Sequence, residues 1–103
     1  MSGSFLYVIG PENEGPVKIG FSKHPEKRLK SIQTGHPEKL ILHHKTQFDQ
    51  TKIRLVERKI HNDLSYKKVN GEWFNITPEE ACDWLDYMLI TYEDVSAGVM
   101  KLL

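Results

Sequence analysis

The sequence predicts an α/β fold of the α+β type, with three strands and three helices in one small domain. Residues 5–9 and 17–21 are rich in apolar and β-branched side chains, and the acids and turn formers between them predict a hairpin. Apolar residues recur at helical spacing from residue 53 to residue 64, and a capping box at residues 77–80 marks the start of a further helix. Together these patterns indicate a mixed domain of strands and helices.

The length and composition of the chain are typical of one soluble globular domain. It has 103 residues, of which 39% are hydrophobic, enough for a modest core. No apolar run approaches the roughly 20 residues that cross a bilayer, and the N-terminal residues lack the charged start and apolar middle of a secretory signal. Cys82 is the only cysteine, which excludes an intramolecular disulfide and favours a reducing compartment. We therefore expect a cytoplasmic protein with no membrane partner.

The net charge of zero conceals a division along the chain. Residues 1–60 contain 11 Lys and Arg against 6 Asp and Glu, a net charge of +5, whereas residues 61–103 contain 3 against 8, a net charge of −5. A basic half favours contact with a polyanion. The alternative is that solvated helix faces of opposite sign simply pack together, and charge alone does not decide between the two.

The predicted hairpin carries two polar side chains of chemical interest. In its second strand Val17 and Ile19 face one way and Lys18 faces the other, because side chains alternate along a strand. Tyr7 lies on the first strand, so the hairpin brings its phenol close to the Lys18 ammonium group.

A short basic helix follows the hairpin. Pro25 suits the first helical position, and Gly35 ends the helix. This helix adds Arg28 beside the polar side chains of the hairpin. A phenol, an ammonium group and a guanidinium group on rigid elements suit a phosphate group.

The middle of the chain predicts a third strand and a long helix. The strand spans Lys39–Phe48, and either Asp49 or Thr51 can cap the helix, which runs to about residue 64. Its predicted buried stripe has helical spacing and consists of Ile53, Val56, Ile60 and Leu64.

Two polar residues of this long helix lie at the margin of the buried stripe. Glu57 and His61 are four residues apart and therefore share a face of the helix. Taken alone, a helix Glu is usually a solvated surface residue and a Glu–His pair more often a simple surface contact, so neither carries a functional claim without the rest of the sequence.

The last part of the chain predicts a turn and a third helix. Asn70-Gly71 is a turn signal, and the capping box Thr77–Glu80 starts the helix. Cys82 is expected near its apolar face, which consists of Ala81, Trp84, Leu85 and Met88. Residues 91–103 have weak periodicity and form either a short extra helix or a partner-binding end.

Six short motifs follow one another from about Ser4 to Met88. They are Leu6–Gly10 (LYVIG), Val17–Ser22 (VKIGFS), P-x-x-R-L with Arg28, Gln33–Leu40 (QTGHPEKL), E-x-x-x-H with Glu57 and His61, and Gly71–Phe74 (GEWF). In order and spacing they resemble the GIY-YIG endonuclease superfamily, in particular its T5orf172/Mug113-type branch. The resemblance implies a three-stranded antiparallel sheet flanked by helices, in a nuclease domain of residues 1–90 followed by a C-terminal tail of residues 91–103.

The resemblance also implies a set of site residues. Tyr7 matches the tyrosine that ends the first family tripeptide, Arg28 matches the family arginine, and Glu57 matches the metal-binding glutamate. Lys18 stands where the second tripeptide normally begins with tyrosine. We therefore expect a catalytic site made of Tyr7, Lys18, Arg28, Glu57 and His61, with Glu57 as the metal ligand.

The implied activity is a divalent-metal-dependent DNA endonuclease with a one-metal mechanism. Glu57 offers hard oxygen atoms to Mg²⁺ or Mn²⁺, and Arg28 offers a charged fork to the phosphate. Tyr7 or Lys18 takes the proton of the attacking water, and Tyr7 needs its pKa of about 10 lowered by nearby cations to do so. Gly20 is expected to let the nucleic-acid backbone approach closely.

The same residues have simpler structural interpretations. Tyr7 is then a half-buried strand residue, Lys18 a solvated edge charge, and Arg28 an ion-pair partner of Glu26 or of C-terminal acids. His61 then supports packing rather than orienting Glu57 or touching the metal, and the aromatic pair Trp73 and Phe74 is predicted to belong to the core.

The main rival function is a nucleic-acid-binding or partner-regulating module that keeps the fold but cuts poorly. The residue change at Lys18 supports this rival. The choice between DNA and RNA stays open, and so does the formation of a homo-oligomer, although stand-alone nuclease domains often need a dimer for double-strand cuts.

Overall fold

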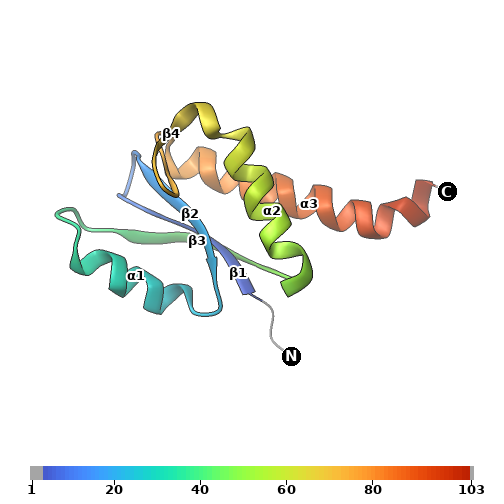
Figure 1. The fold of residues 1–103 in the computed structure, drawn as a ribbon, viewed down its shortest axis with the longest axis horizontal. Coiled ribbons are helices and arrows are strands. Elements are labelled where there is room, and N and C mark those ends of the chain that lie inside the picture. Colours follow the sequence, from blue (N-terminus) through green and yellow to red (C-terminus); the bar gives the residue numbers. More distant parts are fainter. Residues whose placement is uncertain (1–3, 103) are drawn as a thin grey trace.

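The computed structural model describes the backbone of residues 4–102, and the side chains of that range except those of residues 50 and 91–102. The described chain forms a sheet, three α-helices and one 3-10 turn (Figure 1). In chain order the elements are β1 (Ser4–Gly10), β2 (Val17–Ser22), α1 (Pro25–Thr34), β3 (Ile41–Phe48), α2 (Gln50–Asp63), η1 (Ser65–Lys67), β4 (Lys68–Asn70), β5 (Trp73–Phe74) and α3 (Pro78–Leu102).

The sheet is antiparallel and has five strands in the order β3-β1-β2-β5-β4. The fold class of strands with flanking helices is as predicted, but the number of three strands is wrong. The two additional strands form a small hairpin around the predicted Asn70-Gly71 turn, where Gly71 adopts a positive φ of 54°. At three and two residues, β4 and β5 are too short to show an alternating pattern in the sequence.

The two faces of the sheet are covered differently. Helices α2 and α3 pack on one face, over a large apolar cluster that includes Leu6, Val8, Val17, Ile19, Ile60, Phe74 and Leu85. Helix α1 covers the other face, over a smaller cluster formed by Tyr7, Ile9 and Leu40 with partly buried side chains around it. Figure 1 shows α1 on one side of the sheet, with α2 and α3 on the other. The predicted alternation in β2 is therefore confirmed, since Val17 and Ile19 face the large cluster.

The predicted helix starts are confirmed by their capping contacts. The Asp49 carboxylate accepts a hydrogen bond from the Thr51 backbone N–H at the start of α2, at 2.9 Å. At the start of α3, the Thr77 backbone N–H donates to the Glu80 carboxylate and the Glu80 backbone N–H donates to the Thr77 hydroxyl, which is the reciprocal pattern of a capping box. Pro25 is the first residue of α1, as its fixed φ favours.

Helix α3 is longer than the sequence indicates. It runs without a break from Pro78 to Leu102, so residues 91–102 continue it rather than form a separate element. The interpretation of the tail as a partner-binding end lies outside the described side chains. Cys82 is partly buried against the large cluster, as predicted. Among the described residues, no helix combines the length and apolar character that a membrane span requires.

Candidate active site

The outer edge of β2 is where the candidate site forms. Strand β5 pairs with β2 only at Val17 and Lys18, so the rest of that edge is open to side chains from the helices. Tyr7 of β1 lies opposite Gly20 of β2 in the sheet register. Arg28 reaches this place from α1, so elements far apart in the sequence meet at one strand edge.

Tyr7 is the buried member of the site. Its side chain is 1% exposed, and its hydroxyl lies beside the Arg28 guanidinium. Burial raises the pKa of Tyr7 above its usual value of 10.0, and the adjacent Arg28 charge opposes this rise only in part. The lowered pKa that a proton-accepting Tyr7 would need is therefore not present in this structure, because loss of water outweighs the neighbouring cation. The phenol accordingly carries its proton in the resting state.

Gly20 provides the space in which the site residues meet. A Cβ atom at this position would lie 2.7 Å from the Tyr7 hydroxyl oxygen and 2.9 Å from a Glu72 carboxylate oxygen, both closer than real Cβ contacts allow. The structure gives the missing side chain of Gly20 a structural reason, and the approach of a nucleic-acid backbone to it stays a prediction. Side chains of the protein itself occupy the space that the missing Cβ leaves.

Glu72 is a site residue that the sequence did not single out. It lies in the turn between β4 and β5, and its carboxylate accepts a hydrogen bond from the Lys18 ammonium group at 2.8 Å. Its backbone carbonyl accepts a hydrogen bond from the Ile19 N–H at 3.1 Å, which fixes the turn against β2. The signals available were the GEWF motif and the Asn70-Gly71 turn, but neither reveals that this segment pairs with β2.

Lys18 forms an ion pair rather than a solvated edge charge. Its side chain is only 12% exposed, and its partner Glu72 is 39% exposed. The pairing places a cation and a carboxylate side by side at the start of the open strand edge. It also means that Lys18 must give up this partner before it can act elsewhere.

Glu57 reaches the same edge from α2, on the opposite face of the sheet from α1. It is half-buried, and burial together with the nearby Glu72 charge raises its pKa from 4.5 to about 7, while Lys18 and Arg54 act in the opposite direction. Two neighbouring carboxyl groups at one partly buried place are mutually unfavourable when both are ionised. A cation between them would remove this repulsion.

His61 is held against the sheet one turn after Glu57. Its Nε2 atom lies 2.9 Å from the Ile19 carbonyl oxygen, which can only accept, so Nε2 carries a proton and donates. Its ring packs on Phe74 with a centroid distance of 5.0 Å. His61 thus ties α2 to β2 through this nitrogen, and its roles toward Glu57 or a metal stay predictions.

The carboxyl groups of the candidate site fit a hard divalent cation that takes only one or two of its ligands from the protein. Among the described residues, no group of three or more His, Cys, Asp and Glu side chains converges, but Mg²⁺ commonly binds through one or two carboxylates with water and phosphate as its other ligands. Glu57 and Glu72 are two adjacent carboxyl groups of this kind. The pair therefore suits Mg²⁺ or Mn²⁺ and lacks the nitrogen and sulfur ligands of a zinc site.

The simpler interpretations of the remaining residues have mixed outcomes. Glu26 pairs with Lys45 instead of Arg28. Phe74 is fully buried as predicted, whereas Trp73 is half-buried and stacks on His36 at a centroid distance of 5.5 Å. Among the described side chains Arg28 has no ion pair, and it lies exposed beside Tyr7, where its charge is available to an incoming anion. Its predicted pairing with the acids of residues 91–102 lies outside the described side chains.

Comparison with known proteins assigns the family. The model of the T5orf172 domain matches residues 4–89, which is most of the chain and includes every residue of the candidate site. No curated protein and no solved structure matches the chain. The match extends over far more than half of the sequence, and the chain therefore belongs to the T5orf172 domain family.

Proposed function

We propose that this protein is a divalent-metal-dependent endonuclease that hydrolyses phosphodiester bonds in DNA, with a one-metal mechanism of the GIY-YIG type. The T5orf172 family is associated with endonuclease-type proteins. The observation that carries the proposal is the meeting of Tyr7, Arg28, Lys18 and two carboxylates around Gly20. Tyr7 also packs in the smaller apolar cluster, but packing alone does not account for an exposed guanidinium and two carboxyl groups beside its hydroxyl.

Each site residue has a role that its surroundings support. Arg28 binds a non-bridging oxygen of the scissile phosphate, because its planar fork is charged and exposed. Glu57 and Glu72 would hold Mg²⁺ or Mn²⁺, which when bound supplies a Lewis acid and neutralises charge on the phosphate. His61 acts as a positioning residue, since it fastens the helix that carries Glu57 to β2.

Two groups next to that phosphate are candidates for taking the proton of the attacking water. Tyr7 must first lose its own proton, against the effect of burial on its pKa. Lys18 must lose both a proton and its contact with Glu72. The pH dependence of cleavage in Tyr7→Phe and Lys18→Met separates them, because the variant that lacks the base loses the alkaline-rising limb of the profile.

The decisive test is plasmid nicking in Mg²⁺ or Mn²⁺ against EDTA, with the Glu57→Gln variant. This substitution keeps the shape of the side chain and removes the charge that attracts a hard cation. We expect cleavage to fall by orders of magnitude, while binding to DNA in EDTA is kept or strengthened. The matched control is Glu79→Gln, an exposed acid on α3, which should cleave normally. Retained nicking by folded Glu57→Gln would refute the metal assignment.

A second candidate is a nucleic-acid-binding module of the same fold that cuts poorly. The observation that favours it is the Lys18–Glu72 ion pair at 2.8 Å, which engages one candidate base and one candidate metal ligand with each other. This module would bind DNA in EDTA and show no metal-dependent nicking in any variant. The same assay therefore separates the two functions.

The proposed setting follows from the proposed substrate. DNA is the expected partner. The cytoplasm is the expected compartment, since the one cysteine of the chain, Cys82, is free. Double-strand cutting by so small a domain would require two copies, which sedimentation on uncut duplex DNA in EDTA would detect.

A further inference from the structure

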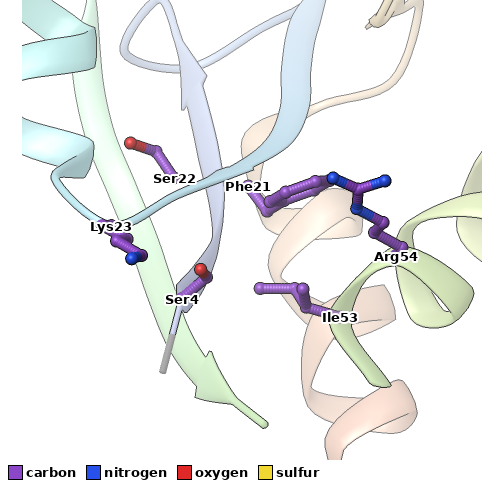
Figure 2. Close-up of a pocket in the computed structure, with 6 residues that line it drawn as sticks. All are labelled: Ser4, Phe21, Ser22, Lys23, Ile53 and Arg54. Carbon is purple, nitrogen blue, oxygen red and sulfur yellow. The ribbon is translucent and has the colours of Figure 1, made fainter. Parts of the chain in front are cut away.

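A polar hollow lies between the end of β2 and α2, and none of the candidate site residues lines it. It has a volume of about 390 Å³ and is lined by Ser4, Phe21, Ser22, Lys23, Ile53 and Arg54. Figure 2 shows Arg54 reaching toward Phe21 from α2, while Ser22 and Lys23 stand on the other side of the hollow. The hollow therefore has a cation on each of two opposite walls.

Some cations in the described part of the chain have a carboxylate partner and others do not, and the two cations of this hollow belong to the second group. Lys18, Lys45 and Lys59 each have a carboxylate partner. Within the described residues, neither Lys23 nor Arg54 takes part in an ion pair. Two cations without an ion-pair partner that line one hollow favour an anion there.

The hollow also offers a neutral hydrogen-bond donor from the backbone. It is not the Ser22 hydroxyl, which accepts from the His24 backbone N–H at 3.0 Å and in Figure 2 points away from Phe21 and Arg54. The Ile19 N–H points outward, to Glu72, and outward-pointing peptide groups recur at every second residue of a strand. Phe21 therefore directs its N–H to the same open edge, where no strand pairs with it.

The position of Arg54 relates this hollow to the candidate active site. Arg54 lies three residues before Glu57, so the two share a flank of α2, and the Arg54 charge acts on the Glu57 carboxyl group. One turn of helix thus separates the unpaired cation from the proposed metal ligand. A strand whose scissile phosphate lies at Glu57 would bring a neighbouring phosphate to this hollow.

We propose that this hollow is a subsite for the phosphate next to the scissile one on the same DNA strand, with Arg54 and Lys23 as its cations and the Phe21 backbone N–H as a neutral donor. The subsite rests on the proposed function, because it deepens the account of how that activity holds its substrate. Such a subsite would define the path of the DNA strand along the open edge of β2, from Glu57 toward Lys23.

The test is the salt dependence of duplex DNA binding, measured by fluorescence anisotropy in EDTA. Each lost phosphate contact reduces the slope of log affinity against log salt by about 0.9. We expect that reduction in Arg54→Gln and in Lys23→Gln, with a several-fold loss of affinity, and recovery of the slope in Arg54→Lys. The matched control is Lys52→Gln, which removes the same charge from the opposite flank of α2.

Two outcomes would overturn the subsite. One is an unchanged slope in Arg54→Gln and Lys23→Gln. The other is an equal change in Lys52→Gln, which would indicate general attraction by a basic helix. Backbone NMR signals of Ser22 and Lys23 provide a direct check, since they should shift on addition of inorganic phosphate to the wild type and stay in place in Arg54→Gln. All of these measurements are made without metal, so their outcome does not depend on metal-dependent nicking. Absence of nicking by the wild type would refute the proposed function and leave the subsite unaffected.

Discussion

The two faces of the sheet differ in how they are built. Helices α2 and α3 cover one face with a continuous apolar cluster in which Leu85, Ile60 and Phe74 are fully buried. On the other face, Pro25 is the one residue of α1 that is buried, and the smaller cluster beneath that helix includes a tyrosine. The first face is a stabilising core. On the second face α1 covers the sheet only thinly, and this face carries polar residues of the candidate site.

The site lies where these two faces meet. Strand β5 leaves most of the outer edge of β2 open, so Arg28 from α1 and Glu57 from α2 can approach the same strand from opposite sides. Rigid packing on one face thereby positions a carboxylate for a site whose other members belong to the lightly covered face. This separation predicts that substitutions on the first face change stability and those on the second change activity.

The largest expected effect is on the well-packed face. Leu85→Ala removes a fully buried side chain from the main cluster, so we expect the free energy of unfolding to fall by about 2–5 kcal/mol. Urea denaturation measures it. Ile90→Ala on the same helix is the control, because Ile90 is 61% exposed and should change stability little. Loss of cleavage per folded molecule in Leu85→Ala would break the proposed separation.

The next effect is on the thinly covered face. Arg28→Lys keeps the charge but loses the two-pronged contact with phosphate, so we expect kcat/KM to fall about 100-fold, or ~2.7 kcal/mol of transition-state stabilisation. The melting temperature should hardly change, since Arg28 is exposed. The reverse exchange on the same helix, Lys30→Arg, is the control. Near-normal cleavage by Arg28→Lys would reduce Arg28 to a surface residue.

The sequence was informative wherever the determining contacts are local. Capping at Asp49 and Thr77 and alternation in β2 depend on residues a few positions apart, and the structure agrees with each. The β4–β5 hairpin is too short for such a pattern. Glu72 was missed for a related reason, because its partner Lys18 lies 54 residues away and they meet only when β5 joins β2.

The protonation states of the site residues could not be predicted from the sequence either. The sign of the Tyr7 pKa change depends on the balance between burial and one adjacent guanidinium. Neither the extent of burial nor that distance can be obtained from spacing along the chain. The family motifs indicated which residues meet, but not the protonation state in which they do so.

Gly20→Ala tests the junction of the two faces. The added methyl group would collide with the Tyr7 hydroxyl and a Glu72 carboxylate oxygen, so we expect a loss of about 1–3 kcal/mol in stability together with a loss of cleavage. Gly35→Ala is the control, since a Cβ atom there meets nothing within 4 Å. Chemical denaturation and nicking assays measure the two effects. If Gly20→Ala keeps both stability and cleavage, Tyr7 and Glu72 are free to move and the compact site described here is wrong.

The smallest expected effect is the pH dependence that Glu57 confers on stability. Burial and the nearby Glu72 charge raise the pKa of Glu57 from 4.5 to about 7 in the folded protein, so the folded state holds this proton more tightly than the unfolded state does. The resulting stability is fully present below pH 4.5 and is lost as the pH rises through 7. Because the side chain is half-buried, solvent screening reduces the loss to about 1 kcal/mol.

Glu57→Gln isolates this contribution, because the amide does not titrate. We would measure the unfolding free energies of the wild type and Glu57→Gln by urea denaturation in EDTA from pH 4.5 to 8. As the pH rises, the wild type should lose about 1 kcal/mol of stability relative to Glu57→Gln. Mg²⁺ should restore the wild type at pH 8 and leave Glu57→Gln unchanged, because a cation bound only by the folded state adds stability by mass action. Parallel pH curves for the two proteins would show that Glu57 is well solvated. In that case α2 does not hold its carboxylate in the repulsive pair with Glu72, and the meeting of the two faces at the edge of β2 would lose its main electrostatic support.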